Sequence, residues 1–135
     1  MARLEAMSKM GYYPTPEELT PNIAKYLKPK GHGLIRILDP CAGEGTALKI
    51  IGDHLDAETY GIEIDRNRGK LAQQKFTKCL ITDYTATQIT PKFASLLWLN
   101  PPYDWAARRS DLERSERYER TFLKDTIKYL IVCRV

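Results

Sequence analysis

The sequence predicts an α/β fold in which helices cover a parallel sheet. Four short apolar runs, at residues 34–38, 59–65, 78–82 and 94–99, have the length and composition of buried strands. Segments with helical spacing separate the first three runs, and this alternation is typical of parallel sheets with crossover connections. Small and acidic residues follow the first two runs, at the sheet edge where open α/β folds bind their ligands.

The composition is that of one soluble domain. Of the 135 residues, 43% are hydrophobic and 28% are charged. No run is long enough to cross a membrane and no signal peptide begins the chain, so we expect a cytoplasmic protein. The net charge of +4 permits a polyanionic partner. Disulfides and a metal site are not expected, because the three cysteines lie far apart in the sequence: Cys41, Cys79 and Cys133.

Helix signals dominate the N-terminal part. The first twelve residues carry apolar side chains three apart, as in a short amphipathic helix. Thr15 and Pro16 suit the cap and first position of a second helix, and Glu18 completes a capping box. Because Pro21 would interrupt that helix, a new start with Thr20 as its cap is expected there.

A strand, a loop of small residues and a helix come next. The strand at 34–38 leads into Asp39-Pro40-Cys41-Ala42-Gly43-Glu44-Gly45-Thr46, and helical spacing resumes over 47–55. The glycines of this loop let the backbone approach a ligand closely, and the helix start offers unpaired N–H groups. Asp39 could instead serve only the entry to the helix.

Acidic residues end the second and third strands. Glu63 lies 20 residues after Gly43, the separation at which α/β nucleotide-binding folds place an acid on ribose hydroxyls. Asp65 is better suited to cap the helix at 66–76 than to bind a ligand. Asp83, after the strand at 78–82, suits either a ligand or a turn.

The fourth apolar run stops at Asn100-Pro101-Pro102-Tyr103. Two consecutive prolines cannot donate ladder hydrogen bonds, and they disfavour helix for the residue before them, so a stiff turn is expected. The turn offers an amide, a carbonyl and an aromatic ring, a set that suits holding and stacking a planar nitrogen group. In a purely structural interpretation, Asn100 is a turn former ahead of the prolines.

The C-terminal part is less specific. Mixed charges at 106–117 indicate a solvated helix or a mobile loop, with direct phosphate contact as the alternative. Helical spacing over 118–130 and an apolar segment at 131–135 predict a helix and the start of a further strand. A sheet that ends there has an exposed edge, through which a dimer could form.

In this order the motifs resemble those of class I S-adenosylmethionine-dependent DNA adenine-N6 methyltransferases. The resemblance covers residues 13 to 105. It implies a Rossmann-like class I methyltransferase sheet, incomplete at the C-terminus, with S-adenosyl-L-methionine as cofactor. As in the gamma group, a Thr-Pro motif and a cofactor loop precede the Asn-Pro-Pro-Tyr (NPPY) motif. The segments that carry it are Pro14-Thr15-Pro16, Asp39 to Gly45, Gly61-Ile62-Glu63-Ile64-Asp65, Asp83 and Asn100-Pro101-Pro102-Tyr103.

The resemblance implies catalytic roles for the NPPY motif. The side-chain oxygen of Asn100 and the carbonyl of Pro101 would accept the two N–H bonds of the target amine. Accepting those bonds draws the nitrogen toward tetrahedral geometry and stabilises the positive charge that develops on it. Pro102 would stiffen the turn, and Tyr103 would stack on the base.

The resemblance also implies a set of cofactor-binding residues. Glu63 would bind the ribose hydroxyls, Ile64 would pack on the cofactor adenine, and Asp83 would accept from its amine. The residues implied at the methionine end and in the cofactor loop are Thr15, Pro16, Asp39, Pro40, Cys41, Ala42, Gly43, Glu44, Gly45 and Asn100.

The implied function is methyl transfer to the N6 amine of adenine in DNA, in a restriction-modification, phage or mobile-element setting. The chain then forms the N-terminal part of a catalytic domain, and because a complete domain of this family has further strands and a recognition domain, we expect a truncated chain. Its parts are the N-terminal helices with the Thr-Pro motif at 1–30, the cofactor and catalytic core at 34–105, and a charged segment, helix and strand start at 106–135.

Two alternatives remain open. The same NPPY turn serves methyltransferases of an RNA base amine or a protein glutamine amide, since all of these substrates present a planar nitrogen. The Thr-Pro motif and the lack of a helical N-terminal domain favour DNA, so nucleic acid is the expected partner and a membrane is not. The non-enzymatic alternative is a truncated, inactive remnant that binds the cofactor.

Overall fold

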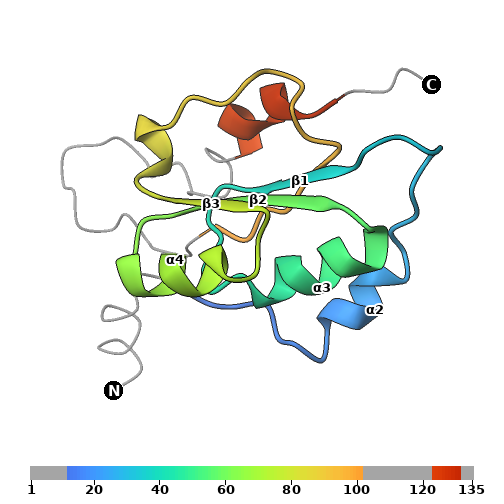
Figure 1. The fold of residues 1–135 in the computed structure, drawn as a ribbon, viewed down its shortest axis with the longest axis horizontal. Helices are drawn as coiled ribbons and strands as arrows, with labels where there is room; N and C mark the ends of the chain where they lie inside the picture. Colours follow the sequence, from blue (N-terminus) through green and yellow to red (C-terminus); the bar gives the residue numbers. More distant parts are fainter. Residues whose placement is uncertain (1–11, 102–122, 132–135) are drawn as a thin grey trace, which may run out of the picture.

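The computed structural model describes residues 12–101 and 123–131, and these form a parallel sheet with helical segments on both faces (Figure 1). The predicted α/β fold with parallel strands is confirmed. Within the described residues the sheet has four strands in the order β3-β2-β1-β4. They are β1 (Arg36–Asp39), β2 (Glu58–Glu63), β3 (Lys78–Ile81) and β4 (Leu96–Leu97).

Two layers cover the sheet. Helices α2 (Thr20–Ala24), α3 (Thr46–Leu55) and α4 (Arg66–Gln73) pack on one face, and η1 (Tyr84–Ala86) and the segment that ends in η2 (Ile127–Tyr129) lie on the other (Figure 1). The larger core lies under the three helices and includes Ile37, Leu48, Ile51, Ala72 and Phe76. The smaller core, on the other face, contains Leu38, Ala94 and Tyr129, with Tyr60 and Phe93 packed against it.

The strand register brings acidic residues to one edge of the sheet. Asp39, the last residue of β1, pairs with Gly61 of β2, so Glu63 ends its strand two residues further along. Glu63 in turn pairs with Ile81, the last residue of β3. The carboxyl ends of three adjacent strands therefore meet where open parallel sheets bind ligands.

Helix α4 begins as the sequence predicts. Asp65 has extended backbone angles, and its side chain accepts a hydrogen bond from the backbone N–H of Arg68, at 2.9 Å. This bond satisfies one of the unpaired N–H groups of the first helical turn. The predicted capping role of Asp65 is confirmed.

The predicted caps at Thr15 and Thr20 are wrong. The carbonyl of Pro16 accepts the backbone N–H groups of both Leu19 and Thr20, which makes this stretch a turn rather than a first helix. Thr20 is the first residue of α2 and is fully buried, and its hydroxyl donates to the Pro16 carbonyl at 3.1 Å. The hydroxyl of Thr15 accepts a bond from Asn100 instead.

The C-terminal segment pairs with the chain just before β4. Ala94 forms a parallel bridge with Leu130, and the N–H of Ile131 donates to the Ala94 carbonyl at 2.8 Å. Residues 123–126 are helical, in line with the helix expected at 118–130. The expected helix in the first twelve residues lies outside the described residues, except for Tyr12. The charged segment at 106–117, the end of the expected strand (132–135), Pro102 and Tyr103 also lie outside them.

One aromatic ring explains why two positions of the core are occupied by glycine. Phe76, which follows α4, is buried, and its ring lies where a Cβ at Gly61 or Gly45 would stand. A Cβ on Gly61 would lie 2.7 Å from Phe76 Cδ2 and 2.9 Å from the Cβ of Ala42, and one on Gly45 would lie 2.8 Å from Phe76 Cε1. These glycines therefore let the helix layer pack closely on the strand ends.

We expect Gly61→Ala to lower the free energy of unfolding by about 1–3 kcal/mol, the usual cost of overpacking a core. Urea denaturation of both proteins measures the change. Gly33→Ala is the matched control, because a Cβ there meets nothing within 4 Å, and its effect should stay within about 0.5 kcal/mol. Equal effects of the two substitutions would contradict the packing role of Phe76.

Candidate functional site

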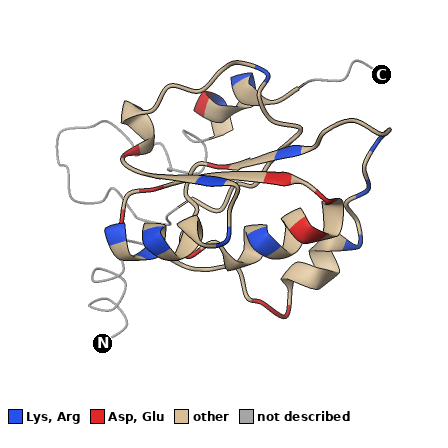
Figure 2. Ribbon diagram, in the orientation of Figure 1, with Lys and Arg blue, Asp and Glu red and all other residues tan. Residues whose placement is uncertain are grey.

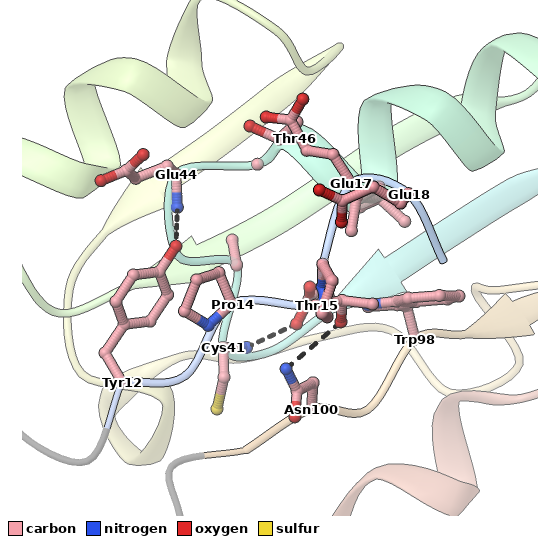
Figure 3. A pocket seen from close by; sticks show the side chains of 16 residues that line it. Tyr12, Pro14, Thr15, Glu17, Glu18, Cys41, Glu44, Thr46, Trp98 and Asn100 are labelled. Atoms are coloured by element: carbon pink, nitrogen blue, oxygen red, sulfur yellow. Dashed lines mark hydrogen bonds between the residues drawn. The ribbon is translucent and has the colours of Figure 1, made fainter. Parts of the chain in front are cut away.

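A cavity of about 330 Å³ opens at the carboxyl ends of β1 and β4 (Figure 3). One wall is the loop of residues 39–46, a second is the end of β4, and a third is residues 12–18, which we call the N-terminal strap. Eight of the residues predicted for the site line this cavity: Thr15, Pro16, Asp39, Cys41, Ala42, Glu44, Gly45 and Asn100.

Asn100 ties the strap to the end of β4. Its amide nitrogen Nδ2 donates to the backbone carbonyl of Tyr13 at 2.8 Å and lies 3.3 Å from the hydroxyl oxygen of Thr15. Because a carbonyl can only accept, Nδ2 is the atom that faces the strap, and the side-chain oxygen Oδ1 is the atom left to accept from a ligand. Pro101, the next residue, is buried.

Asp39 is a nearly buried acid in the cavity wall. Its side chain is 3% exposed, and Oδ1 accepts the backbone N–H of Cys41 at 2.9 Å. Burial, together with the nearby charge of Glu63, raises the pKa of Asp39 from 3.8 to about 7, although the bond from Cys41 opposes the shift. The same environment raises the pKa of the Cys41 thiol, so this cysteine stays protonated and is a poor nucleophile.

Glu63 lies next to the loop, and four protein donors surround its carboxylate. The backbone N–H groups of Gly43 and Asp65 each donate at 2.8 Å, and Arg68 donates through Nε at 3.3 Å and Nη2 at 3.1 Å. The Arg68 guanidinium also stacks on the ring of Tyr12, 4.6 Å from its centroid. A ribose bound at Glu63 would thus take the place of some of these donors.

Tyr12 covers the loop at Gly43. Gly43 has a left-handed φ of 59°, and a Cβ on it would lie 2.9 Å from the hydroxyl oxygen of Tyr12. That hydroxyl accepts the backbone N–H of Glu44, at 3.3 Å. The space over this glycine, which the sequence assigned to a ligand, is therefore filled by an aromatic ring in the structure.

Five predicted cofactor residues do not line the cavity: Pro40, Gly43, Glu63, Ile64 and Asp83. Ile64 is 54% exposed at the end of β2, so its side chain is available to pack on a flat ring. Asp83 is exposed, and its Oδ1 accepts both the N–H and the hydroxyl of Thr85, each at 2.8 Å. In the structure Asp83 thus caps η1, which is the turn-forming role.

Eight further residues line the cavity and were not among the predicted site residues: Tyr12, Pro14, Glu17, Glu18, Thr46, Ala47, Leu48 and Trp98. Thr46, Ala47 and Leu48 form the first turn of α3, and no side chain caps this helix start within the described part of the chain. The sequence signal that could have indicated Glu17 and Glu18 is their position directly after the Thr-Pro motif. Of the two, only Glu18 was assigned a role from the sequence, as part of a capping box.

The cavity has a definite electrostatic character. Four carboxylate side chains line it, namely Glu17, Glu18, Asp39 and Glu44, and among its described lining residues there is no Lys, Arg or His. The uncapped start of α3 offers N–H groups that favour an anion. The cavity thus combines a place for positive charge with a place for a carboxylate, as the zwitterionic end of an amino acid requires.

The described residues show neither a helix that is long and apolar enough to cross a membrane nor a group of three His, Cys, Asp or Glu side chains that could hold a metal ion.

A family model described as an uncharacterised methyltransferase family (DUF6094) matches residues 1–135. No curated protein matches the chain. Among solved structures, the chain is similar to a geranyl diphosphate methyltransferase in complex with GPP and sinefungin, with a TM-score of 0.60 and 10% identity over 85% of the chain. It is also similar to P. horikoshii TYW2 in complex with MeSAdo, with a TM-score of 0.59 and 15% identity over 87% of the chain. At these identities the likeness concerns the fold, and the chain spans 41% of each of those proteins.

Proposed function

The chain belongs to the uncharacterised methyltransferase family, and from this premise we propose that it transfers a methyl group from S-adenosylmethionine to the exocyclic N6 amine of adenine in DNA. S-adenosylmethionine is the methyl donor that suits this fold, since the two structural neighbours described above are in complex with sinefungin and with MeSAdo. The NPPY motif supports adenine as the target.

The cavity fits the amino-acid end of this donor. The α-ammonium and sulfonium groups are positive, and the buried carboxylate of Asp39 lies in the cavity wall. The α-carboxylate suits the uncapped start of α3, where Thr46 and Ala47 line the cavity. Glu63 and the exposed side chain of Ile64 lie on the next strand end, where the ribose and adenine would follow.

The single observation that carries the proposal is the orientation of Asn100. Its nitrogen is bound to the strap through Tyr13. Within the described residues its oxygen has no hydrogen-bond donor, which supports a role for this oxygen as the acceptor of an N–H bond from a target amine. An exocyclic amine is a weak nucleophile because its lone pair is delocalised into the ring. Acceptors aimed at its N–H bonds favour the tetrahedral, positively charged nitrogen of the transition state.

The methyl transfer requires no strong base. The nitrogen lone pair forms the new N–C bond, and the S–C electron pair returns to sulfur, which leaves as a neutral thioether. The amine proton is then released to water. Binding in line, with nitrogen, methyl carbon and sulfur aligned, supplies much of the acceleration. A paired adenine can reach such a cavity only if it is flipped out of the duplex.

The test of this proposal is methyl transfer itself. The chain is incubated with tritiated S-adenosylmethionine and, separately, duplex DNA, RNA and a glutamine-containing peptide. We expect label on DNA, recovered as N6-methyladenine after digestion. Label on RNA or peptide alone would replace DNA by that substrate, and binding of the donor without any transfer would favour a cofactor-binding remnant.

We expect Glu63→Ala to weaken binding of S-adenosylmethionine by about 1.5–3 kcal/mol, the scale of hydrogen bonds to a charged group. Isothermal titration calorimetry gives the dissociation constant. Glu58→Ala is the control, because Glu58 lies at the opposite end of β2 and pairs with Arg36. Circular dichroism shows that both variants are folded, and unchanged affinity in folded Glu63→Ala would remove Glu63 from the donor site.

A further inference from the structure

The cavity is acidic although the protein is basic. The chain has a net charge of +4, and Figure 2 shows basic residues along α4. In contrast, the cavity is lined by four carboxylates and, within the described residues, by no basic side chain. A local charge of opposite sign to the whole chain is a property of this site and does not follow from the composition.

The four carboxylates occupy two walls of the cavity. Asp39 lies at the start of the loop of residues 39–46, where it is almost fully buried. Glu44 lies on the loop, and Glu17 and Glu18 lie on the N-terminal strap, with all three exposed at the rim. Figure 3 shows the two strap carboxylates on the same side of the cavity as Thr46. Their exposure makes them sensitive to salt, whereas the charge of Asp39, which is present once pH rises above its pKa of about 7, is screened much less.

Two cations lie near the loop, and protein groups already hold both. Lys75 Nζ donates to the carbonyl of Glu44 at 2.8 Å and to the hydroxyl of Thr46 at 3.1 Å. Arg68 is paired with Glu63 and stacked on Tyr12. Neither of them lines the cavity. Within the described residues no ion pair involves the four lining carboxylates, so their charge acts on a ligand that enters.

We propose that this set of carboxylates makes the site select a positively charged ligand, with Glu17 and Glu18 as specificity-determining residues that favour the methyl donor over its demethylated product. The inference rests on the proposed function, and it concerns how the site distinguishes the methyl donor from the demethylated product. Methyl transfer converts a sulfonium into a neutral thioether, so the ligand loses one positive charge. The carboxylates attract the positive sulfonium of the donor, whereas the neutral thioether of the product offers them no charge at that position.

This selectivity has a chemical consequence at the end of each reaction cycle. The product leaves a site whose field no longer holds it, and a new donor is drawn into it. The rim repels a polyanion, because its phosphates carry the same sign of charge as Glu17 and Glu18. A target base would therefore enter the site while its phosphates remain outside this rim.

The experiment is calorimetry on the full chain with three ligands of matched size: S-adenosylmethionine, S-adenosylhomocysteine and sinefungin. Sinefungin carries a protonated amine near the position of the sulfonium, so it tests charge without the methyl group. We expect S-adenosylmethionine and sinefungin to bind about tenfold more tightly than S-adenosylhomocysteine at about 0.05 M salt. At about 0.5 M salt that ratio should fall to about threefold or less.

The matched variants isolate the strap. The double substitution Glu17→Gln and Glu18→Gln keeps size and polarity, and we expect it to lower the ratio at low salt to about threefold. Glu58→Gln removes the same kind of charge at the far end of β2 and should leave the ratio unchanged. Because the salt arm uses the unmodified chain, it tests charge selection even where a variant fails to fold.

The outcomes separate the two proposals. Equal affinities for all three ligands, or tighter binding of S-adenosylhomocysteine, would overturn charge selection and leave the methyltransferase proposal standing. A ratio that Glu58→Gln lowers as much as the strap variant does would overturn the role of Glu17 and Glu18. If the chain bound none of the three ligands, the proposed function would fail together with this inference.

Discussion

Asn100→Ala is expected to reduce single-turnover methylation of duplex DNA by about two to three orders of magnitude, the usual cost of losing one preorganised electrostatic partner. The alanine removes the oxygen that accepts from the target amine and keeps the backbone carbonyl of Pro101. Affinity for S-adenosylmethionine should change much less than the rate, because the acceptor acts chiefly in the transition state. Rapid-quench kinetics with tritiated donor, divided by the folded fraction, measure the effect.

Asn100 also holds the strap, so a control must separate the two roles. Thr15→Val removes the hydroxyl that faces Nδ2 at 3.3 Å and leaves the bond from Nδ2 to the Tyr13 carbonyl. We expect it to lower the rate by less than about tenfold, as for loss of one neutral hydrogen bond. If Asn100→Ala lowered stability but left the rate per folded molecule unchanged, Asn100 would be a turn former and the main support for an amine target would be lost.

The second large effect concerns pH. The folded chain keeps a proton on Asp39 up to about pH 7, whereas the unfolded carboxyl releases it near the ordinary value of 3.8. The free energy of unfolding contributed by this group therefore falls as pH rises, by about 1.4 kcal/mol per unit and by about 4 kcal/mol in all. Asp39→Asn cannot ionise, so we expect the difference between the two proteins to change by that amount between pH 4 and pH 8.

Urea denaturation at several pH values measures this difference, and Asp53→Asn, a change on the exposed side of α3, is the control. Above pH 7 the cost of the ionised Asp39 is offset when a cationic ligand binds beside it. We therefore also expect S-adenosylmethionine to bind the unmodified chain more tightly as pH rises through 7, and this trend should be absent in Asp39→Asn. If the free energies of unfolding of the two proteins changed in parallel with pH, folding would not raise the pKa of Asp39.

Most of the fold was predictable because strong local patterns specify it. The apolar runs that became β1 and β2 are flanked by helical periods, and the capping role of Asp65 follows from its position before a helix. The failures lie at Thr15 in the strap and at Thr20 just after it, where the threonine hydroxyl groups bond to other partners than the helix start. The carbonyl of Pro16 accepts the hydrogen bonds there, and the side chain of Asn100, distant in sequence, occupies the hydroxyl of Thr15.

The candidate site was predictable in outline and not in its contacts. The family resemblance assigned Asp39 and Asn100 to one cofactor site, and both line the cavity. Spacing carries no information on what fills the space over a glycine, so the ring of Tyr12 on Gly43 could not be inferred. The acidic character of the cavity depends on the fold of the strap, and it too required coordinates.

The ring of Phe76 also constrains how this family can change through evolution. Alanine at Gly45 or Gly61 is disfavoured while the ring is present, since each added Cβ would lie within 3 Å of it. A smaller side chain at position 76 would remove that contact at both positions, at the cost of a cavity in the core. Gly45 would still be strained as alanine because its φ is 82°. Positions 61 and 76 are therefore the coupled pair: alanine at Gly61 should cost less free energy of unfolding once residue 76 is smaller.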